Sequence, residues 1–121
     1  MKVLVCGSRK WTNRAVIERR LGQLPPGTII VHGDCASGAD LIAEEVATEL
    51  GLETRRYPAD WSLGKGAGII RNADMLRREH RSGDPVDLGL AFTEDLRRSR
   101  GTRDMVVRLG TKGIKTEVIA E

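Results

Sequence analysis

Short runs of apolar residues alternate along the chain with longer stretches in which apolar residues recur every three or four positions. Apolar runs of this length are typical of buried strands, and the three-to-four spacing is typical of helices that bury one face. The predicted strands are 2–6, 29–31, 52–57, 86–92 and 114–119. The predicted helices are 13–23, a stretch between Gly38 and Gly51, 67–81 and 101–110.

The alternation of these elements predicts the architecture. Five strands joined by four helices through short connections favour an open parallel sheet, because right-handed crossovers place the helices on its two faces. A chain of 121 residues has room for one core. We therefore expect an α/β fold with a single Rossmann-like domain over residues 1–121, in which helices cover both faces of a mostly parallel, five-stranded sheet.

Several side chains near the helix starts have local interpretations that need no ligand. With Thr12 as the cap of the first helix, Trp11 and Val16 stand at the two positions of a hydrophobic staple. Ser37 and Asp40 have the spacing of a capping box, in which each side chain satisfies a backbone N–H group. The third helix is expected to carry two distinct sides, with Ile69, Ala73, Leu76 and His80 on one and Arg71, Met75 and Arg78 on the other.

Composition restricts the class of partner. Hydrophobic residues make up 40 % of the chain and charged residues 31 %, and the net charge of +3 is spread over interleaved acids and bases. This balance is ordinary for a globular domain and permits an anionic small molecule. Aromatic residues make up only 3 %, too few for a platform that stacks single-stranded bases, so nucleic acid is not the expected partner.

The cysteines and the first apolar run indicate the compartment. The two cysteines show no Cys-x-x-Cys or Cys/His spacing, which predicts free thiols and no metal site. The first apolar run is too short for a signal peptide and is followed by charge, so a cytoplasmic protein without a membrane segment is expected. No cofactor is expected.

The strand at 29–31 continues through Gly33 and Gly38 into a helix, and such a unit can hold a phosphate. The N–H groups at the helix start point into the loop, the helix dipole favours negative charge, and the glycines let a ligand approach the backbone. The loop lacks both the three-glycine dinucleotide pattern and the Gly-Lys-Ser/Thr of a P-loop. The motif therefore predicts an anion or nucleotide site without naming its type.

Polar side chains gather in the loops at the strand ends. In open α/β sheets, ligands bind outside the carboxyl ends of the strands, near the point where the strand order reverses. A basic, glycine-rich rim at that edge suits a phosphorylated small molecule. The residues expected on the rim are Ser8, Arg9, Asp34, Cys35, Asp60, Trp61, Lys65, Arg71, Asn72, Arg100 and Thr102.

Five short motifs in this order resemble a known family. They are Gly7-Ser8-Arg9, His32-Gly33 with Gly38-Ala39-Asp40, Pro58-Ala59-Asp60-Trp61, Arg71-Asn72 and Ser99-Arg100-Gly101-Thr102. Together they are similar to the small SLOG-type Rossmann-like proteins (YspA/YpsA-like), which are related to the LOG (lonely guy) phosphoribohydrolases. The resemblance extends over nearly the whole chain. It implies a nucleotide or nucleotide-derived ligand, with Gly33, Gly38, Ala39, Asp40, Gly101 and Thr102 at its phosphate and ribose.

The same resemblance bears on catalysis. In the phosphoribohydrolases, an arginine on the third helix and a glutamate three residues after the Gly-Thr pair act on the N-glycosidic bond. Arg71 matches the arginine, but Met105 stands where the glutamate is expected. If the protein is an enzyme, the catalytic candidates are Arg71, Asp104 and Asp60. Asp104 precedes Met105 by one residue and so points about 100° away from it on a helix.

Two functions remain open from the sequence, a sensor or binding module and an N-glycosidic-bond hydrolase. A homodimer is plausible by analogy alone. His32 is interpreted as a satisfied core histidine, Cys6 as packed and Cys35 as exposed on its loop. The residues predicted to bind the ligand are Gly7, Ser8, Arg9, Gly33, Asp34, Cys35, Gly38, Ala39, Asp40, Trp61, Asn72, Arg100, Gly101 and Thr102.

Overall fold

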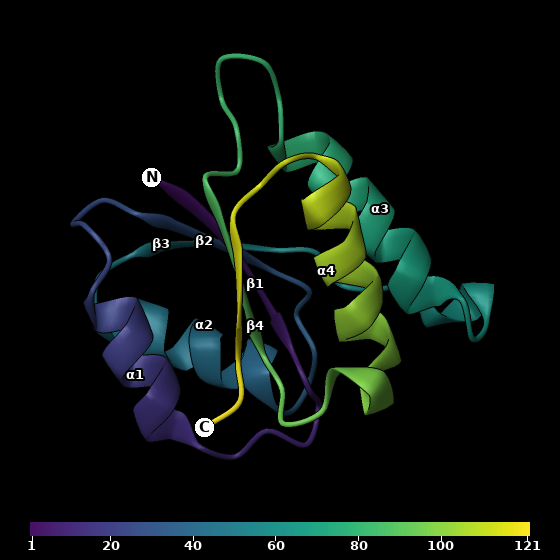
Figure 1. Ribbon diagram of the computed structural model, residues 1–121, viewed down its shortest axis with the longest axis horizontal. Coiled ribbons are helices and arrows are strands. Elements are labelled where there is room, and N and C mark those ends of the chain that lie inside the picture. Colours follow the sequence, from purple (N-terminus) through teal and green to yellow (C-terminus); the bar gives the residue numbers. More distant parts are fainter.

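A computed structural model describes residues 1–121 and shows one five-stranded sheet with helices on both faces (Figure 1). All neighbouring strands are parallel, in the order β3-β2-β1-β4-β5. The strands are β1 (Lys2–Gly7), β2 (Ile29–His32), β3 (Glu53–Arg56), β4 (Leu88–Phe92) and β5 (Thr116–Ile119). The helices are α1 (Arg14–Gly22), α2 (Ala39–Glu49), α3 (Ala67–Glu79) and α4 (Arg100–Thr111). The α/β, Rossmann-like layout predicted from the sequence is confirmed.

The order of the strands reverses at β1. From β1 the chain adds β2 and β3 on one side of the sheet and then returns to add β4 and β5 on the other. In the register between β1 and β4, Gly7 lies opposite Phe92, so both strands end at the same level. The loops that follow β1 and β4 leave toward opposite faces, which opens a crevice between them at the carboxyl edge of the sheet.

Alternate side chains of β1 build two cores. Val3 and Val5 pack under α1 and α2, whereas Leu4 and Cys6 pack under α3 and α4. Figure 1 shows the two helix pairs on opposite sides of the sheet. The period of two along a strand thus explains why this short apolar run serves both faces. No helix is long and apolar enough to cross a membrane.

Several predicted element boundaries shift by one or two residues. β4 begins at Leu88 and not at Val86, because the N–H of Val86 donates to Nδ1 of His80 at 3.0 Å. β5 begins at Thr116 because the N–H of Ile114 donates to the carbonyl of Leu109 at 3.0 Å, in the turn that follows α4. These N–H groups bond to neighbouring segments before they reach the sheet, and apolar periodicity does not report that.

The predicted cap of α1 is wrong by one residue. Asn13, and not Thr12, is the N-cap, and its side chain accepts a hydrogen bond from the N–H of Val16 at 3.3 Å. Trp11 therefore does not stand at the staple position. Its ring is buried beside Phe92, with the ring centroids 5.8 Å apart, and its Nε1 donates to the carbonyl of Asn13 at 2.9 Å.

The buried face of α3 takes residues from both predicted sides. Met75 and Leu76, which were expected on different sides, are both buried, together with Asn72 and Glu79. The helix packs against α4 and places Met75 and Leu76 in the core that lies on the sheet, so its buried face is wide and includes polar positions.

Candidate functional site at the strand-order reversal

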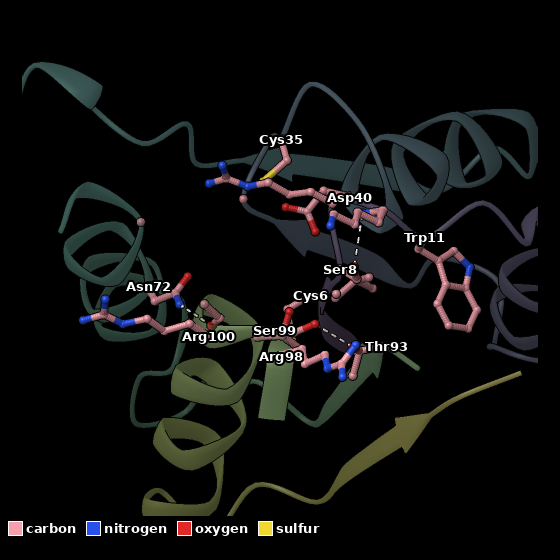
Figure 2. Close-up of a pocket in the computed structure, with 18 of the residues that line it drawn as sticks. Cys6, Ser8, Trp11, Cys35, Asp40, Asn72, Thr93, Arg98, Ser99 and Arg100 are labelled. Carbon is pink, nitrogen blue, oxygen red and sulfur yellow. Dashed lines mark hydrogen bonds between the residues drawn. The ribbon is translucent and has the colours of Figure 1, made fainter. Parts of the chain in front are cut away.

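A cavity of about 470 Å³ opens at the carboxyl edge of the sheet, where the strand order reverses. Its walls are the loop after β1, the start of α2, one face of α3 and the loop that leads from β4 into α4. Figure 2 shows Cys35 and Asp40 on one wall and Arg98, Ser99 and Arg100 on the opposite one, with Cys6 and Ser8 between them. This position is the one that the fold favours for a ligand.

The structure brings many of the predicted site residues together and leaves others outside. The predicted residues that line the cavity are Gly7, Ser8, Arg9, Gly33, Cys35, Asp40, Arg71, Asn72, Arg100, Gly101 and Thr102. Those outside the lining are Asp34, Gly38, Ala39, Asp60, Trp61, Lys65 and Asp104.

Gly38 and Ala39 shape the cavity from behind. Gly38 has φ of +76°, and a Cβ atom there would stand 2.3 Å from the carbonyl oxygen of Ser8. The N–H of Ala39 donates to that same oxygen at 3.0 Å. Only glycine tolerates both the positive φ and the close approach, so this residue lets the β1 loop lie directly on the start of α2.

The expected capping box at the start of α2 is wrong. The N-cap is Gly38, which makes no side-chain hydrogen bond, and the hydroxyl of Ser37 donates to the carbonyl of Arg9 at 3.2 Å. Because the β1 loop occupies the helix start, Ser37 bonds across to that loop. Asp40 is left without the capping role that the spacing suggested.

Asp40 is the buried carboxylate of the cavity. Its side chain is only 5 % exposed, and Oδ1 has no hydrogen-bond partner. Burial raises the pKa of this carboxyl, and the smaller opposing effects of His32, Cys35 and Arg71 do not cancel the rise. A buried polar oxygen without a partner is rare in native proteins. It indicates that a hydrogen-bond donor from outside the chain belongs in front of it.

The start of α4 offers free donors on the facing wall. Ser99 is the N-cap, but its hydroxyl pairs with that of Thr93 at 2.7 Å and caps no backbone group. The N–H groups of Arg100, Gly101 and Thr102 have no partner in the chain. A helix start of this kind attracts an anion, because the N–H groups and the helix dipole act together.

Basic side chains add positive charge without acidic partners. Arg71 donates to the carbonyl oxygens of Gly33 and of Tyr57, the latter at 3.2 Å, and its Nε donates to Asn72 at 3.0 Å. These acceptors are neutral, and the guanidinium forms no ion pair in the chain. The side chain of Arg9 lies over the ring of Trp61, 4.7 Å from the centroid, which supports the cation from outside the cavity.

Asn72 ties α3 to the start of α4. Its Nδ2 donates to the carbonyl of Gly101 at 3.0 Å and to Oδ2 of Asp104 at 3.1 Å. Asp104 also accepts from Nε of Arg108 at 2.8 Å. Its carboxylate is thus committed to holding the two helices together, outside the cavity.

The other catalytic candidates also lie away from the cavity. Asp60 accepts from the backbone and the hydroxyl of Ser62, at 3.1 and 2.6 Å, and caps a short 3₁₀ turn. Met105, which stands where a glutamate was expected, is fully buried in the core under α3 and α4.

His32 and the cysteines are placed largely as the sequence suggested. His32 is fully buried, its Nδ1 accepts from the N–H of Asp34 at 3.0 Å, and its Nε2 lies 2.7 Å from Glu44. Both ring nitrogens are satisfied. Cys6 is buried, whereas Cys35 is half-buried and not exposed, and burial raises the pKa of both thiols.

The sequence interpretation missed several lining residues, most of them in the loop after β4. They are Lys10, Gly68, Thr93, Glu94, Asp95, Arg98 and Ser99. Asp95 lies within 3.6 Å of Arg98, so part of the charge at this mouth is compensated. The available indication was position, because all but Gly68 lie in a loop after a predicted strand. Ser99 is part of the motif Ser99-Arg100-Gly101-Thr102, and Arg98 directly precedes it.

No group of three or more His, Cys, Asp and Glu side chains is placed to hold a metal ion. Comparison with curated proteins and with solved structures finds no match. A family does match over residues 1–64, which is just over half of the 121-residue chain and runs from β1 through β3. The chain therefore belongs to the YAcAr family, described as the YspA, cpYpsA-related SLOG family.

Proposed function

We propose that this protein binds a nucleotide or nucleotide-derived molecule in the cavity at the strand-order reversal, and that it acts as a sensor or binding module. The observation that carries the proposal is the pairing of two unsatisfied groups across one cavity. The start of α4 presents three free N–H groups, and Asp40 presents a free carboxylate oxygen. Such a site calls for a ligand with an anionic group at one end and hydrogen-bond donors at the other.

The start of α4 suits a phosphate group. The free N–H groups of Gly101 and Thr102 supply direct donors, and the neighbouring Arg100 has no acidic partner. Gly101 has no heavy atom within 4 Å of where a Cβ would stand, so the backbone there is open to a ligand. The start of α2 suits a phosphate less well, since the Ser8 carbonyl already uses the N–H of Ala39.

The size of the cavity also fits a small molecule. Ligand pockets usually have volumes of about 300 to 1,000 Å³, with a few polar groups among mostly fixed walls. The 470 Å³ found here lies within that range. Membership of a SLOG family supports a nucleotide-related ligand, and the family match alone names no base.

We propose binding in preference to N-glycosidic cleavage. Cleavage requires a carboxylate within reach of the sugar and of a water molecule. Asp104 is committed to Asn72 and Arg108, Asp60 caps a turn, and neither lines the cavity. Asp40 does line it, but on α2, whereas the related hydrolases carry their glutamate on the helix after the Gly-Thr pair, where this chain has Met105. We expect incubation with nucleoside monophosphates to release no free base at a rate above the uncatalysed one. Rapid base release, abolished by Asp104→Asn or Asp60→Asn, would establish the hydrolase instead.

Native mass spectrometry of freshly purified protein and a thermal-shift panel test the binding. The panel holds nucleoside mono- and diphosphates, cyclic nucleotides, NAD and ADP-ribose. A ligand at 100 times its Kd stabilises the native state by about 2.7 kcal/mol, which raises the melting temperature measurably. If no retained ligand and no shift appear across the panel, the proposed function is wrong.

A matched pair of variants places the ligand. Arg100 lines the cavity, whereas Arg103 lies on the same helix outside the lining and donates only to the carbonyl of Arg97, at 3.0 Å. Arg100→Ala should weaken phosphate-dependent binding by about tenfold, as loss of a charge-assisted hydrogen bond does. Arg103→Ala should leave the affinity unchanged. Equal effects of the two would indicate general electrostatic attraction and no specific contact.

A further inference from the structure

The one buried acidic residue of this cavity, Asp40, stands on the wall opposite to α4. On α4 itself, Met105 is buried in the core and Asp104 is bonded to Asn72, so that helix presents no carboxylate to the cavity. On the facing wall, Asp40 reaches the cavity from the first turn of α2. Figure 2 shows Asp40 and Ser99 facing one another across it.

Within the chain, the hydrogen-bond contacts of Asp40 are with Cys35 alone, and they leave Oδ1 without a partner. It caps no helix, it forms no ion pair and its Oδ1 accepts no hydrogen bond. Its neighbours on the buried side of α2 are Ala39 and Ala43, so a small apolar side chain would pack there without this cost. A buried carboxylate without a full set of partners destabilises the fold, and it is retained where a ligand completes the set.

The charges of the cavity decide which part of a ligand reaches Asp40. A phosphate is drawn to the free N–H groups of α4 and is repelled by the carboxylate. The part that meets Asp40 must therefore be uncharged or cationic and must donate hydrogen bonds. In a nucleotide, the ribose hydroxyls are neutral donors attached next to the phosphate. Two neighbouring hydroxyls also match the two oxygens of one carboxylate.

We infer that Asp40 accepts hydrogen bonds from the ribose hydroxyls of the bound nucleotide and makes the site selective for ribonucleotides over their deoxy forms. This inference rests on the proposed nucleotide-binding function. It assigns to α2 the sugar contact that the α4 wall does not provide. Burial raises the pKa of the Asp40 carboxyl. His32, Cys35 and Arg71, which lie outside α2, lower this pKa by a smaller amount.

The test measures how the affinity for a nucleotide depends on its sugar. Isothermal titration calorimetry with the four ribonucleoside monophosphates and their 2′-deoxy and 2′,3′-dideoxy counterparts gives a selectivity ratio for each base. The wild-type protein should bind the ribonucleotide about 10- to 100-fold more tightly than the dideoxy form, as expected for hydrogen bonds to a charged group. In Asp40→Ala, this ratio should fall to within about threefold.

Two further variants control for structural effects. Asp40→Asn keeps the size of the side chain and one carbonyl acceptor, so it should show an intermediate ratio. Glu45→Ala removes an exposed carboxylate from the same helix and should keep the wild-type ratio. The melting temperature of ligand-free Asp40→Ala should equal or exceed that of the wild type, because the buried, unpartnered Oδ1 is removed and only the contacts with Cys35 are lost. A marked decrease would show that Asp40 has a structural role, and would overturn the inference.

The remaining outcomes separate this inference from the proposed function. If nucleotides bind without a ribose preference, or if the preference survives in Asp40→Ala, the inference fails and the binding function stands. If Asp40→Ala changes the preference among bases while the sugar ratio stays the same, Asp40 contacts the base and the inference is wrong. If none of these nucleotides binds, this inference is overturned, and the broader thermal-shift panel then decides whether the binding function falls with it.

Discussion

Glu79→Gln tests the buried ionic cluster that joins the end of α3 to β1. One oxygen of Glu79 lies 3.2 Å from Nζ of Lys2 and accepts from Arg55 at 2.9 Å, and the other accepts from the hydroxyl of Tyr57. The side chains of Lys2 and Glu79 are only 3 % and 4 % exposed. The substitution keeps the size of the side chain and removes the charge that all three donors share.

The expected loss follows from what remains around Lys2. Breaking a buried ion pair from one side costs about 3–5 kcal/mol, because the other charge stays buried without compensation. Here Asp84 remains 3.1 Å from Nζ, so we expect about 3 kcal/mol, at the lower end of that range. An unfolding entropy of about 2.1 cal/mol/K per residue amounts to roughly 250 cal/mol/K for a chain of this length. The melting temperature should therefore fall by about 12 °C.

Thermal unfolding followed by circular dichroism at pH 7, with chemical denaturation as a second measure, checks this value. Glu45→Gln is the matched control, because its pair with Arg14 is exposed and pairs of that kind contribute about 0–1 kcal/mol. If Glu79→Gln lowers the free energy of unfolding by less than about 1 kcal/mol, the cluster stabilises the fold no more than an exposed ion pair does, and the prediction is wrong.

Three further predictions concern pH, thiol reactivity and backbone packing. Burial raises the pKa of Glu79, but the hydrogen bonds that its carboxylate accepts lower the pKa by more. The carboxylate should therefore stabilise the fold above about pH 4.3, and this stabilisation should be lost as the pH falls through the lower pKa of the folded state. The difference in melting temperature between wild type and Glu79→Gln should shrink at pH 3. Alkylation of Cys35, followed by mass spectrometry, should slow when a nucleotide that binds is added, whereas the buried Cys6 should react slowly throughout; a Cys35 rate that is independent of bound nucleotide would remove this thiol from the site. Gly7→Ala should destabilise the protein, because the added Cβ would stand 2.4 Å from the carbonyl oxygen of Phe92. Gly110→Ala, in an open part of α4, should stabilise the protein by up to about 1 kcal/mol. Similar melting temperatures for the two variants would contradict this prediction.

Local patterns in the sequence are enough to identify the helices and strands and the class of fold. Apolar runs such as 2–6 and the three-to-four spacing of the helices arise from burial on regular backbones, and each can be recognised within about ten residues. Because parallel strands joined by right-handed crossovers end at one edge, the loops after them were expected to share a rim. The cavity indeed collects Ser8, Cys35, Arg71 and Gly101, which are far apart in the chain.

Which polar groups of the cavity lack a hydrogen-bond partner depends on how the elements pack. Ser37 and Asp40 had the spacing of a capping box, but the β1 loop lies on the start of α2 and uses its first N–H group. Asp104 was a candidate for catalysis from the sequence, but the packing of α3 on α4 places it where it accepts a hydrogen bond from Asn72. Whether a polar group is satisfied depends on neighbours from distant parts of the chain, and local spacing does not carry that information. For this reason the unpartnered oxygen of Asp40 became visible only once the chain was folded.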